Sequence, residues 1–501
     1  MSNQIHIIQN AITTTISEIF RGDFRRICEV KKAVLHLEAI YFCHGTCYLL
    51  KRENMPIKDQ LALYQRIELI PQSTTEFFEN NRECIINNWP EESALAAKPE
   101  ILYDALLASE FCVQPERVGY KIDKVSRDIA GAYYTSSDFS AQITYRALES
   151  YMDRKRRRAI DSDSFACCNE YENITFLDYS CGCGEFLLAV IQYFDNHVLG
   201  YSRKKLATQL RGVDVNPIAL MITIARIVSA VEAEDDENLL REVAKNFIVG
   251  NPLLHSDKIA PLEVRFDNFA LNRLYAETEG INCLELEQQN LVVLGNPPWE
   301  KLRFEERAFF RPVCPAISAI SQKNKREKEI KKLAVNWLEL LEYYQLLQDD
   351  YASVKKEIPK HPLLKVSLVG ELNTYAMFAE LASRLTEKDG FAAIIVKSAL
   401  VTSTCYSSCF RHFVNQGSLS EVFLFDNREK LFQIDSREKF CVLFFGGEHA
   451  GGIKVHYGLT KQEQILSSVP INVTSEELEL INPETGLLPN VADSKEFSFL
   501  L

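Results

Sequence analysis

Four consecutive residues, Asn296, Pro297, Pro298 and Trp299, have the chemistry to bind a planar amino group. The side-chain oxygen of Asn296 and the backbone oxygen of Pro297 are acceptors on a stiff backbone, and they match the two hydrogens of an exocyclic amine on a nucleobase. Trp299 offers a face on which that base could stack. The alternative is a structural turn with a buried tryptophan, because motifs of four residues often occur by chance.

The element that must position these residues is a strand. Residues 291–294 are an apolar run too short for a helix, and Gly295 followed by two prolines must end it. In open α/β sheets, ligands bind beyond the carboxyl ends of the strands. The sequence therefore places the four residues where a ligand is expected.

A second turn has the features of a nucleotide-type site. Gly182 and Gly184 follow a predicted strand at residues 174–178 and precede an apolar helix. Without Cβ atoms, the backbone of such a turn can approach a ligand at the helix N-terminus. The next predicted strand, residues 210–214, ends in Asp214, which could bond two ribose hydroxyls or could cap the following helix.

The remaining elements fit a mostly parallel sheet, because strands and helices alternate from residue 174 onward. Further strands are predicted at residues 247–249, 390–396, 422–425 and 440–445, with the last two forming a hairpin. Residues 1–120 and 301–360 have helical patterns, and Asn373 with Thr374 caps another helix.

The composition is that of a globular protein with two or three domains: 501 residues, 47% hydrophobic and 25% charged. No run of eighteen apolar residues and no signal peptide is evident, so we expect no membrane segment and a cytoplasmic location. Cys43, His44 and Cys47 resemble half a metal site, but no tight second pair lies nearby, and no metal is expected.

The net charge of −13 is the wrong sign for non-specific binding to nucleic acid. Two local basic runs, Arg154–Arg158 and Lys323–Lys332, are the candidates for contact with a phosphate backbone. The alternative is that each run is a solvated face.

Taken in order, these motifs resemble the γ-class N6-adenine DNA methyltransferases over residues 125–450, particularly the large bacterial type IIG restriction-modification and phage-defence enzymes. The resemblance implies a Rossmann-like α/β sheet flanked by helices and S-adenosylmethionine as cofactor. The implied cofactor-binding residues are Tyr133, Thr135, Asp178, Cys181, Gly182, Gly184, Phe186, Asp214 and Asn251. The implied catalytic residues are Asn296, Pro297, Pro298 and Trp299, and the implied base-stacking residues are Trp299, Phe432 and Phe440.

The sequence departs from the family pattern at three positions. Tyr179 stands where the family has proline, Cys183 where it has serine, and Asn251 where an aspartate commonly contacts the cofactor's adenine. Family members also continue into a target-recognition domain. The resemblance implies DNA as a partner. We expect a separate specificity subunit to supply the recognition that this domain provides in family members. The expected domains are a helical region 1–120, a methyltransferase domain 121–460 with a helical insertion at 300–365, and an extension 461–501.

Other functions are also compatible with the sequence. The Asn-Pro-Pro-aromatic motif also serves enzymes that methylate RNA bases or glutamine amides in proteins. The chain could instead be a scaffold subunit that keeps the fold with little activity, as Asn251 and the acidic charge suggest. Glu29 and Lys31 resemble one end of a metal-dependent nuclease site, which would need further carboxylates.

Overall fold

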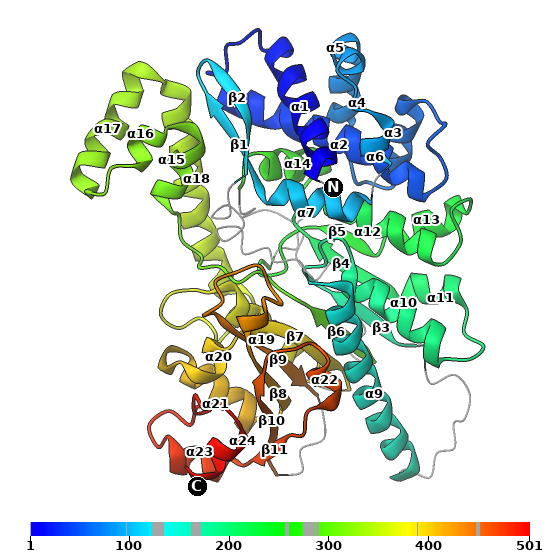
Figure 1. Ribbon diagram of the computed structural model, residues 1–501, viewed down its shortest axis with the longest axis vertical. Helices are drawn as coiled ribbons and strands as arrows, with labels where there is room; N and C mark the ends of the chain where they lie inside the picture. The colour runs from blue at the N-terminus through cyan, green and yellow to red at the C-terminus, as the bar shows by residue number, and fades with distance from the viewer. Residues whose placement is uncertain are drawn as a thin grey trace. The chain divides into compact units, whose positions relative to one another are not determined.

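The computed structural model of the protein describes residues 2–96, 98–122, 135–161, 171, 173–255, 260–273, 286, 290–387, 389–446 and 451–500. The chain divides into two compact units, whose helices and strands are labelled in Figure 1. The first comprises Met1–Ala130, Asp214–Gly280 and Leu302–Ile358, and the second comprises Gly131–Val213, Ile281–Lys301 and Pro359–Leu501.

The first unit is mainly helical. Its helices are α1 (Ser2–Ile19), α2 (Ile27–Leu49), α3 (Ile57–Arg66), α4 (Gln72–Asn80), α5 (Arg82–Asn87), α6 (Glu92–Leu95), α7 (Pro99–Leu107), α12 (Pro217–Ala230), α13 (Glu237–Ala244), α14 (Leu262–Ala270), α15 (Glu306–Val313), α16 (Pro315–Ser318), α17 (Lys323–Asn336) and α18 (Leu338–Glu357). Helix α2 is buried along most of its length and packs against α3, α4, α12, α14 and α18, so it forms the centre of the unit.

The first unit also contains strands, which the helical expectation for residues 1–120 did not include. Strands β1 (Ser109–Gln114) and β2 (Arg117–Ile122) form an antiparallel hairpin, and β5 (Phe247–Val249) follows α13. The hairpin is stabilised by a cross-strand ring pair, since the ring centres of Phe111 and Tyr120 are 4.9 Å apart.

The second unit is built on a sheet. Its strands are β3 (Thr175–Asp178), β4 (Leu210–Asp214), β6 (Leu291–Gly295), β7 (Phe391–Lys397), β8 (Leu419–Asp426), β9 (Lys439–Phe445), β10 (Ile453–Leu459) and β11 (Ile471–Val473). Its helices are α9 (Ser137–Asp161), α10 (Glu185–His197), α11 (Arg203–Gln209), α19 (Thr374–Leu385), α20 (Ala399–Thr402), α21 (Ser407–Asn415), α22 (Gln464–Ser467), α23 (Ser475–Ile481) and α24 (Ser494–Ser498). Short 3-10 turns are η2 (Ile358–Lys360), η3 (Thr404–Tyr406) and η4 (Asn427–Glu429).

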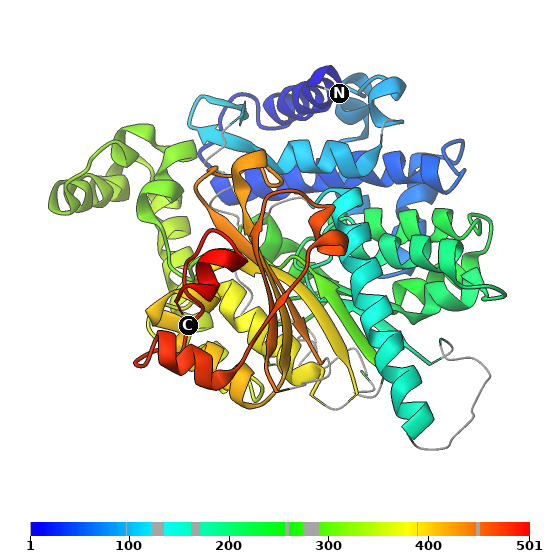
Figure 2. The ribbon, with the colours of Figure 1, turned by 60° about the horizontal axis from the view of Figure 1, so that its bottom comes forward.

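The strands of this unit lie in the order β11-β10-β8-β9-β7-β6-β3-β4 (Figure 2). Strands β4, β3, β6 and β7 are parallel, and β9 runs antiparallel between β7 and β8. This confirms the α/β fold and the final hairpin, while β10 and β11 extend the sheet beyond it. Strands β6 and β7 are buried almost throughout, as expected where helices such as α9, α10 and α19 cover a parallel sheet.

The order of the strands defines where a ligand can bind. The chain passes from β3 to its neighbour β4, and later returns to β6 on the other side of β3. The direction in which the sheet grows therefore reverses at β3, and ligands of open α/β sheets bind at such a switch point. The turns that follow β3 and β6 carry the two motifs found in the sequence.

Candidate functional site at the switch point of the sheet

The turn after β3 has a rigid backbone. Asp178, which ends the strand, is 2% exposed, and its Oδ1 accepts a hydrogen bond of 3.0 Å from the Ser180 backbone nitrogen. Gly182 and Gly184 have φ angles of +50° and +84°, a region that favours glycine. Among the residues that the structure describes, none has an atom within 4 Å of a Cβ added to Gly182, at the N-terminus of α10.

Two other predicted cofactor residues of this turn pack inward. The side chains of Cys181 and Phe186 are 5% and 3% exposed, and the Cys181 nitrogen donates 3.0 Å to the oxygen of Val213 at the end of β4. Any contact that these two residues make with a ligand must therefore use mainly the backbone. Cys183, which replaces serine, is also buried.

The turn after β6 lies directly against the turn after β3. A Cβ atom on Gly295 would be 2.7 Å from Asp178 Oδ1, so only glycine allows the two strand ends to approach this closely. Asn296 Nδ2 donates 3.1 Å to Thr135 Oγ1, and Thr135 is 5% exposed. The structure thus brings together three separate sequence motifs around Asn296.

Trp299, the aromatic residue of the motif, is fixed by a hydrogen bond and by contacts with two other rings. Trp299 is 4% exposed, and its Nε1 donates 3.3 Å to the oxygen of Ile395 in β7. Its ring centre is 5.2 Å from that of Phe432, edge to face, and 6.1 Å from that of Phe440, stacked. Both phenylalanines are buried. The three rings predicted to stack on a base are together, and here they pack on one another.

Asp214, the last residue of β4, and Asn251 belong to the first unit, whereas the rest of β4 belongs to the second. Asp214 Oδ1 accepts 2.8 Å from the Asn216 nitrogen, and Asn216 in turn caps α12 by accepting 2.9 Å from the nitrogen of Ile218. Asp214 therefore stabilises the turn after β4, and the residue that caps α12 is Asn216. Asn251 Oδ1 accepts 3.0 Å from the Leu253 nitrogen.

One predicted site residue, Tyr133, lies outside the described residues. The predicted helix at Asn373 and Thr374 begins at the expected position, but Asn373 makes no side-chain cap. Instead its Nδ2 donates to the oxygen of Glu371 and to the hydroxyl of Tyr406.

The first basic run is partly structural. Arg154 is 5% exposed, and its guanidinium donates to the backbone oxygens of Asp389, Gly390 and Gly446. The expectation that Arg154 contacts DNA is wrong, because the side chain holds the ends of β7 and β9. Arg156 is exposed and lies 3.5 Å from Asp153.

The second basic run forms helix α17 of the first unit. Arg326 is 8% exposed and pairs with Glu306 of α15, so it attaches the helix to its neighbour. Lys325 and Lys328 are exposed. The phosphate-contact hypothesis for this segment therefore rests on its exposed lysines and excludes Arg326.

The other motifs considered in the sequence lie on helix α2. His44 is buried, and its Nδ1 is 3.0 Å from Gln60 Oε1. Glu29 is exposed and pairs with Arg26 at 2.8 Å, whereas the ammonium of Lys31 lies 5.6 Å from the ring centre of Tyr343. Among the described residues, no helix is long and apolar enough to cross a membrane.

Three residues of the site were not identified from the sequence. Thr374 bonds the backbone on both sides of Trp299, through Pro298 and Glu300. The hydroxyl of Tyr179 donates 3.1 Å to the oxygen of Phe378 in α19, so the residue that replaces proline ties the turn after β3 to this helix. Burial raises the pKa of the Glu300 carboxyl to about 8. Tyr179 gave a signal as a departure from the family pattern, and Thr374 gave one as part of a predicted helix cap, whereas Glu300 gave none.

Comparison with known protein families and with curated proteins finds no match. Among solved structures, the chain is similar to DrdV in complex with DNA (12% identity, TM-score 0.47, covering 97% of this chain and 46% of that chain). It is also similar to a nuclease-deletion mutant of the type ISP restriction-modification enzyme LlaGI with a DNA substrate mimic (12%, 0.45, 93% and 35%). A third similarity is to the type I restriction-modification methyltransferase subunit from Streptococcus thermophilus (11%, 0.40, 97% and 98%).

The chain spans less than half the length of the DrdV and LlaGI chains. Similarities with TM-scores below 0.5 establish neither a family nor an activity. The residues at the switch point are what support a function.

Proposed function

We propose that this chain transfers the methyl group of S-adenosylmethionine to the N6 amino group of an adenine in DNA, as part of a restriction-modification or phage-defence system. The observation that carries the proposal is the meeting of two turns at the switch point of the sheet. In the turn after β3, a Cβ at Gly182 would have no described atom within 4 Å, and the turn of Asn296 to Trp299 lies against it through the contact of Gly295 with Asp178.

The residues of the first turn suit the cofactor. The backbone at Gly182 precedes the N-terminus of α10, whose partial positive charge would favour the carboxylate of the methionine part. Asp214 ends the neighbouring strand and could accept from the ribose hydroxyls. When bound, S-adenosylmethionine supplies an electrophilic methyl group on a sulfonium.

The residues of the second turn suit an amine as the acceptor. The lone pair of an adenine amino group is delocalised into the ring, so the nitrogen is a weak nucleophile. Acceptors at its two hydrogens, Asn296 Oδ1 and the Pro297 oxygen, would favour the pyramidal geometry reached in the transition state. The bond from Asn296 Nδ2 to Thr135 fixes the amide, so Oδ1 points away from Thr135. Alignment of donor and acceptor then supplies most of the rate enhancement.

DNA is the proposed substrate, with the target base turned out of the duplex. The exposed lysines of α17 are proposed to contact phosphates, and a separate specificity subunit is proposed to supply sequence recognition. RNA bases and protein glutamine amides are alternative acceptors for the same motif.

A second candidate function is supported by one observation. Trp299, Phe432 and Phe440 pack on one another, so the rings that would hold a base are already in contact with each other. A scaffold subunit, or an enzyme whose rings separate only when a partner binds, fits that packing.

Transfer of tritium from labelled S-adenosylmethionine to DNA, RNA and protein tests these proposals together, with the modified nucleoside identified by mass spectrometry. We expect N6-methyladenine in DNA. Asn296→Ala should retain cofactor binding by calorimetry and lower the transfer rate by a factor of about 100 or more. An Asn296→Ala variant as fast as wild type would refute the role of Asn296. Cofactor binding without transfer to any acceptor, with the candidate specificity subunit present, would favour the scaffold.

A further inference from the structure

The turn after β6 lacks backbone donors at two successive positions. Pro297 and Pro298 have no N–H groups, so this part of the turn cannot use its own nitrogens to fix its carbonyl groups. The proposed mechanism nevertheless needs the Pro297 oxygen in a defined direction. The constraint must therefore come from another segment of the chain.

Thr374 supplies this constraint. Its Oγ1 donates to the Pro298 oxygen at 2.6 Å and accepts from the Glu300 nitrogen at 3.0 Å, so one hydroxyl bridges the two sides of Trp299. The Thr374 nitrogen also donates 2.9 Å to the oxygen of Glu300. The hydroxyl thereby replaces the hydrogen bond that closes an ordinary turn.

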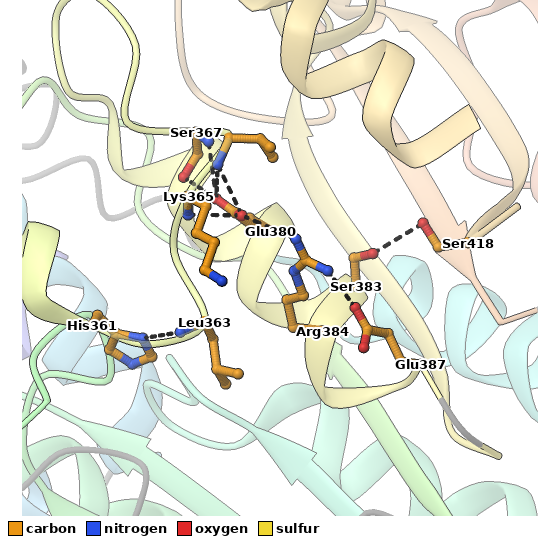
Figure 3. A network of polar contacts seen from close by, with 10 residues as sticks. His361, Leu363, Lys365, Ser367, Glu380, Ser383, Arg384, Glu387 and Ser418 are labelled. Carbon is orange, nitrogen blue, oxygen red and sulfur yellow. Dashed lines mark hydrogen bonds and ion pairs between the residues drawn. The ribbon is translucent and has the colours of Figure 1, made fainter. Parts of the chain in front are cut away.

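Thr374 is itself held in place. It is 4% exposed and is the first residue of α19, and a β-bridge joins the preceding Asn373 to Lys301. The segment leading to it is fixed by Glu380, whose buried carboxylate accepts from the backbone nitrogens of residues 365–367 (Figure 3). A residue that is fixed on both sides can determine the direction of the Pro298 carbonyl.

We propose that Thr374 is a positioning residue for methyl transfer, acting through the Pro298 carbonyl on the acceptor geometry at Asn296 and Pro297. The effect of Thr374 on the rate of methyl transfer rests on the proposed function. The stabilisation of the turn after β6 by the Thr374 hydroxyl does not depend on any enzymatic activity. The two parts can therefore be tested independently.

The test compares Thr374→Val, which keeps the shape and removes the hydroxyl, with Thr374→Ser, which keeps the hydroxyl. Thr386→Val is the matched control, because Thr386 is 2% exposed at the end of the same helix and its hydroxyl bonds only Ala382 and Ser383 of that helix among the described residues. Single-turnover methyl transfer, cofactor affinity by calorimetry and hydrogen exchange at the Glu300 amide are measured for all four proteins.

We expect Thr374→Val to lower the transfer rate about 10- to 100-fold, since small displacements of reacting groups have effects of this size. Cofactor affinity should stay within about twofold, because the hydroxyl bonds of Thr374 to the described part of the chain all go to the turn after β6. Exchange at the Glu300 amide should become faster by a factor of about 10 or more, because its acceptor is lost. Thr374→Ser should restore both rate and protection, and Thr386→Val should match wild type.

Wild-type exchange at Glu300 in Thr374→Val, or failure of Thr374→Ser to restore protection, would overturn the holding role. Faster exchange with an unchanged transfer rate would overturn the positioning role in catalysis. If the wild-type protein transfers no methyl group, the proposed function fails, and the exchange measurement alone then decides whether the hydroxyl holds the turn.

Discussion

Replacing Glu380 by glutamine removes the central acceptor of the polar network in Figure 3. The carboxylate is fully buried, and its Oε1 accepts from the nitrogens of Lys365 at 2.8 Å and Val366 at 3.0 Å. Its Oε2 accepts from the Ser367 nitrogen at 2.9 Å and the Ser367 hydroxyl at 2.7 Å. In Glu380→Gln, one of these oxygens becomes an NH₂ group that cannot accept.

With the NH₂ group in the Oε1 position, the Lys365 nitrogen faces a donor, whereas the Val366 nitrogen keeps Oε2 as an acceptor at 3.1 Å. Losing one backbone hydrogen bond to a buried charge costs about 1.5–3 kcal/mol of unfolding free energy. Chemical denaturation followed by circular dichroism measures the loss, and hydrogen exchange locates it at residues 365–367. Glu387→Gln is the control, because Glu387 is 51% exposed and its ion pair with Arg384 is a surface pair worth less than about 1 kcal/mol. Equal losses in the two variants would refute the reasoning.

Three further predictions concern other parts of the site. Gly295→Ala should lower the rate of tritium transfer from labelled S-adenosylmethionine at least about 10-fold, because the added Cβ would lie 2.7 Å from Asp178 Oδ1. Burial raises the pKa of Glu300 to about 8, so the folded state keeps a proton that the unfolded chain releases above about 4.5. Wild type should therefore lose about 3–5 kcal/mol relative to Glu300→Gln between about pH 4.5 and 8 in denaturation experiments. Arg154→Met should cost about 3–5 kcal/mol in the same measurement and leave retention on DNA unchanged.

Each of these predictions has a control or a contrary outcome. Gly119→Ala is the control for Gly295, because a Cβ at that strand position meets, among the described residues, only Thr13 Cγ2 at 3.9 Å. A stability difference for Glu300→Gln that does not vary with pH would contradict the assigned ionisation. Arg156→Met should be neutral within about 0.5 kcal/mol, and weaker DNA retention by Arg154→Met at full stability would return Arg154 to the DNA-binding hypothesis.

The strands of the sheet were predictable because buried parallel strands are continuous apolar runs with clear ends. Leu291–Gly295 satisfies this condition, and its limits agree with the prediction to within one residue. Leu210–Asp214 contains Arg211 and Gly212 and is not such a run, but its predicted limits are also those of the strand. The hairpin of Ser109–Ile122 was missed because its apolar residues are few and interleaved with charges.

The site was predictable only where a motif is local. The role of Thr374 could not be inferred, because its partner Pro298 is 76 positions away and the bond exists only after the sheet has formed. The burial of Arg154 has the same origin, since a run of basic residues gives no information about which one faces the carbonyl groups at the ends of distant strands. Tertiary context decides such cases.

The division of the chain into two interleaved units has a consequence for truncation and for recombination of the gene. The sequence passes from one unit to the other after residues 130, 213, 280, 301 and 358, so neither unit is a single contiguous fragment. A stop codon after residue 301 would remove α15 to α18 from one unit and β7 to β11 from the other. Gene fragments of this protein therefore cannot be expected to supply an independently folding half, and recombination that exchanges one unit must preserve several junctions at once.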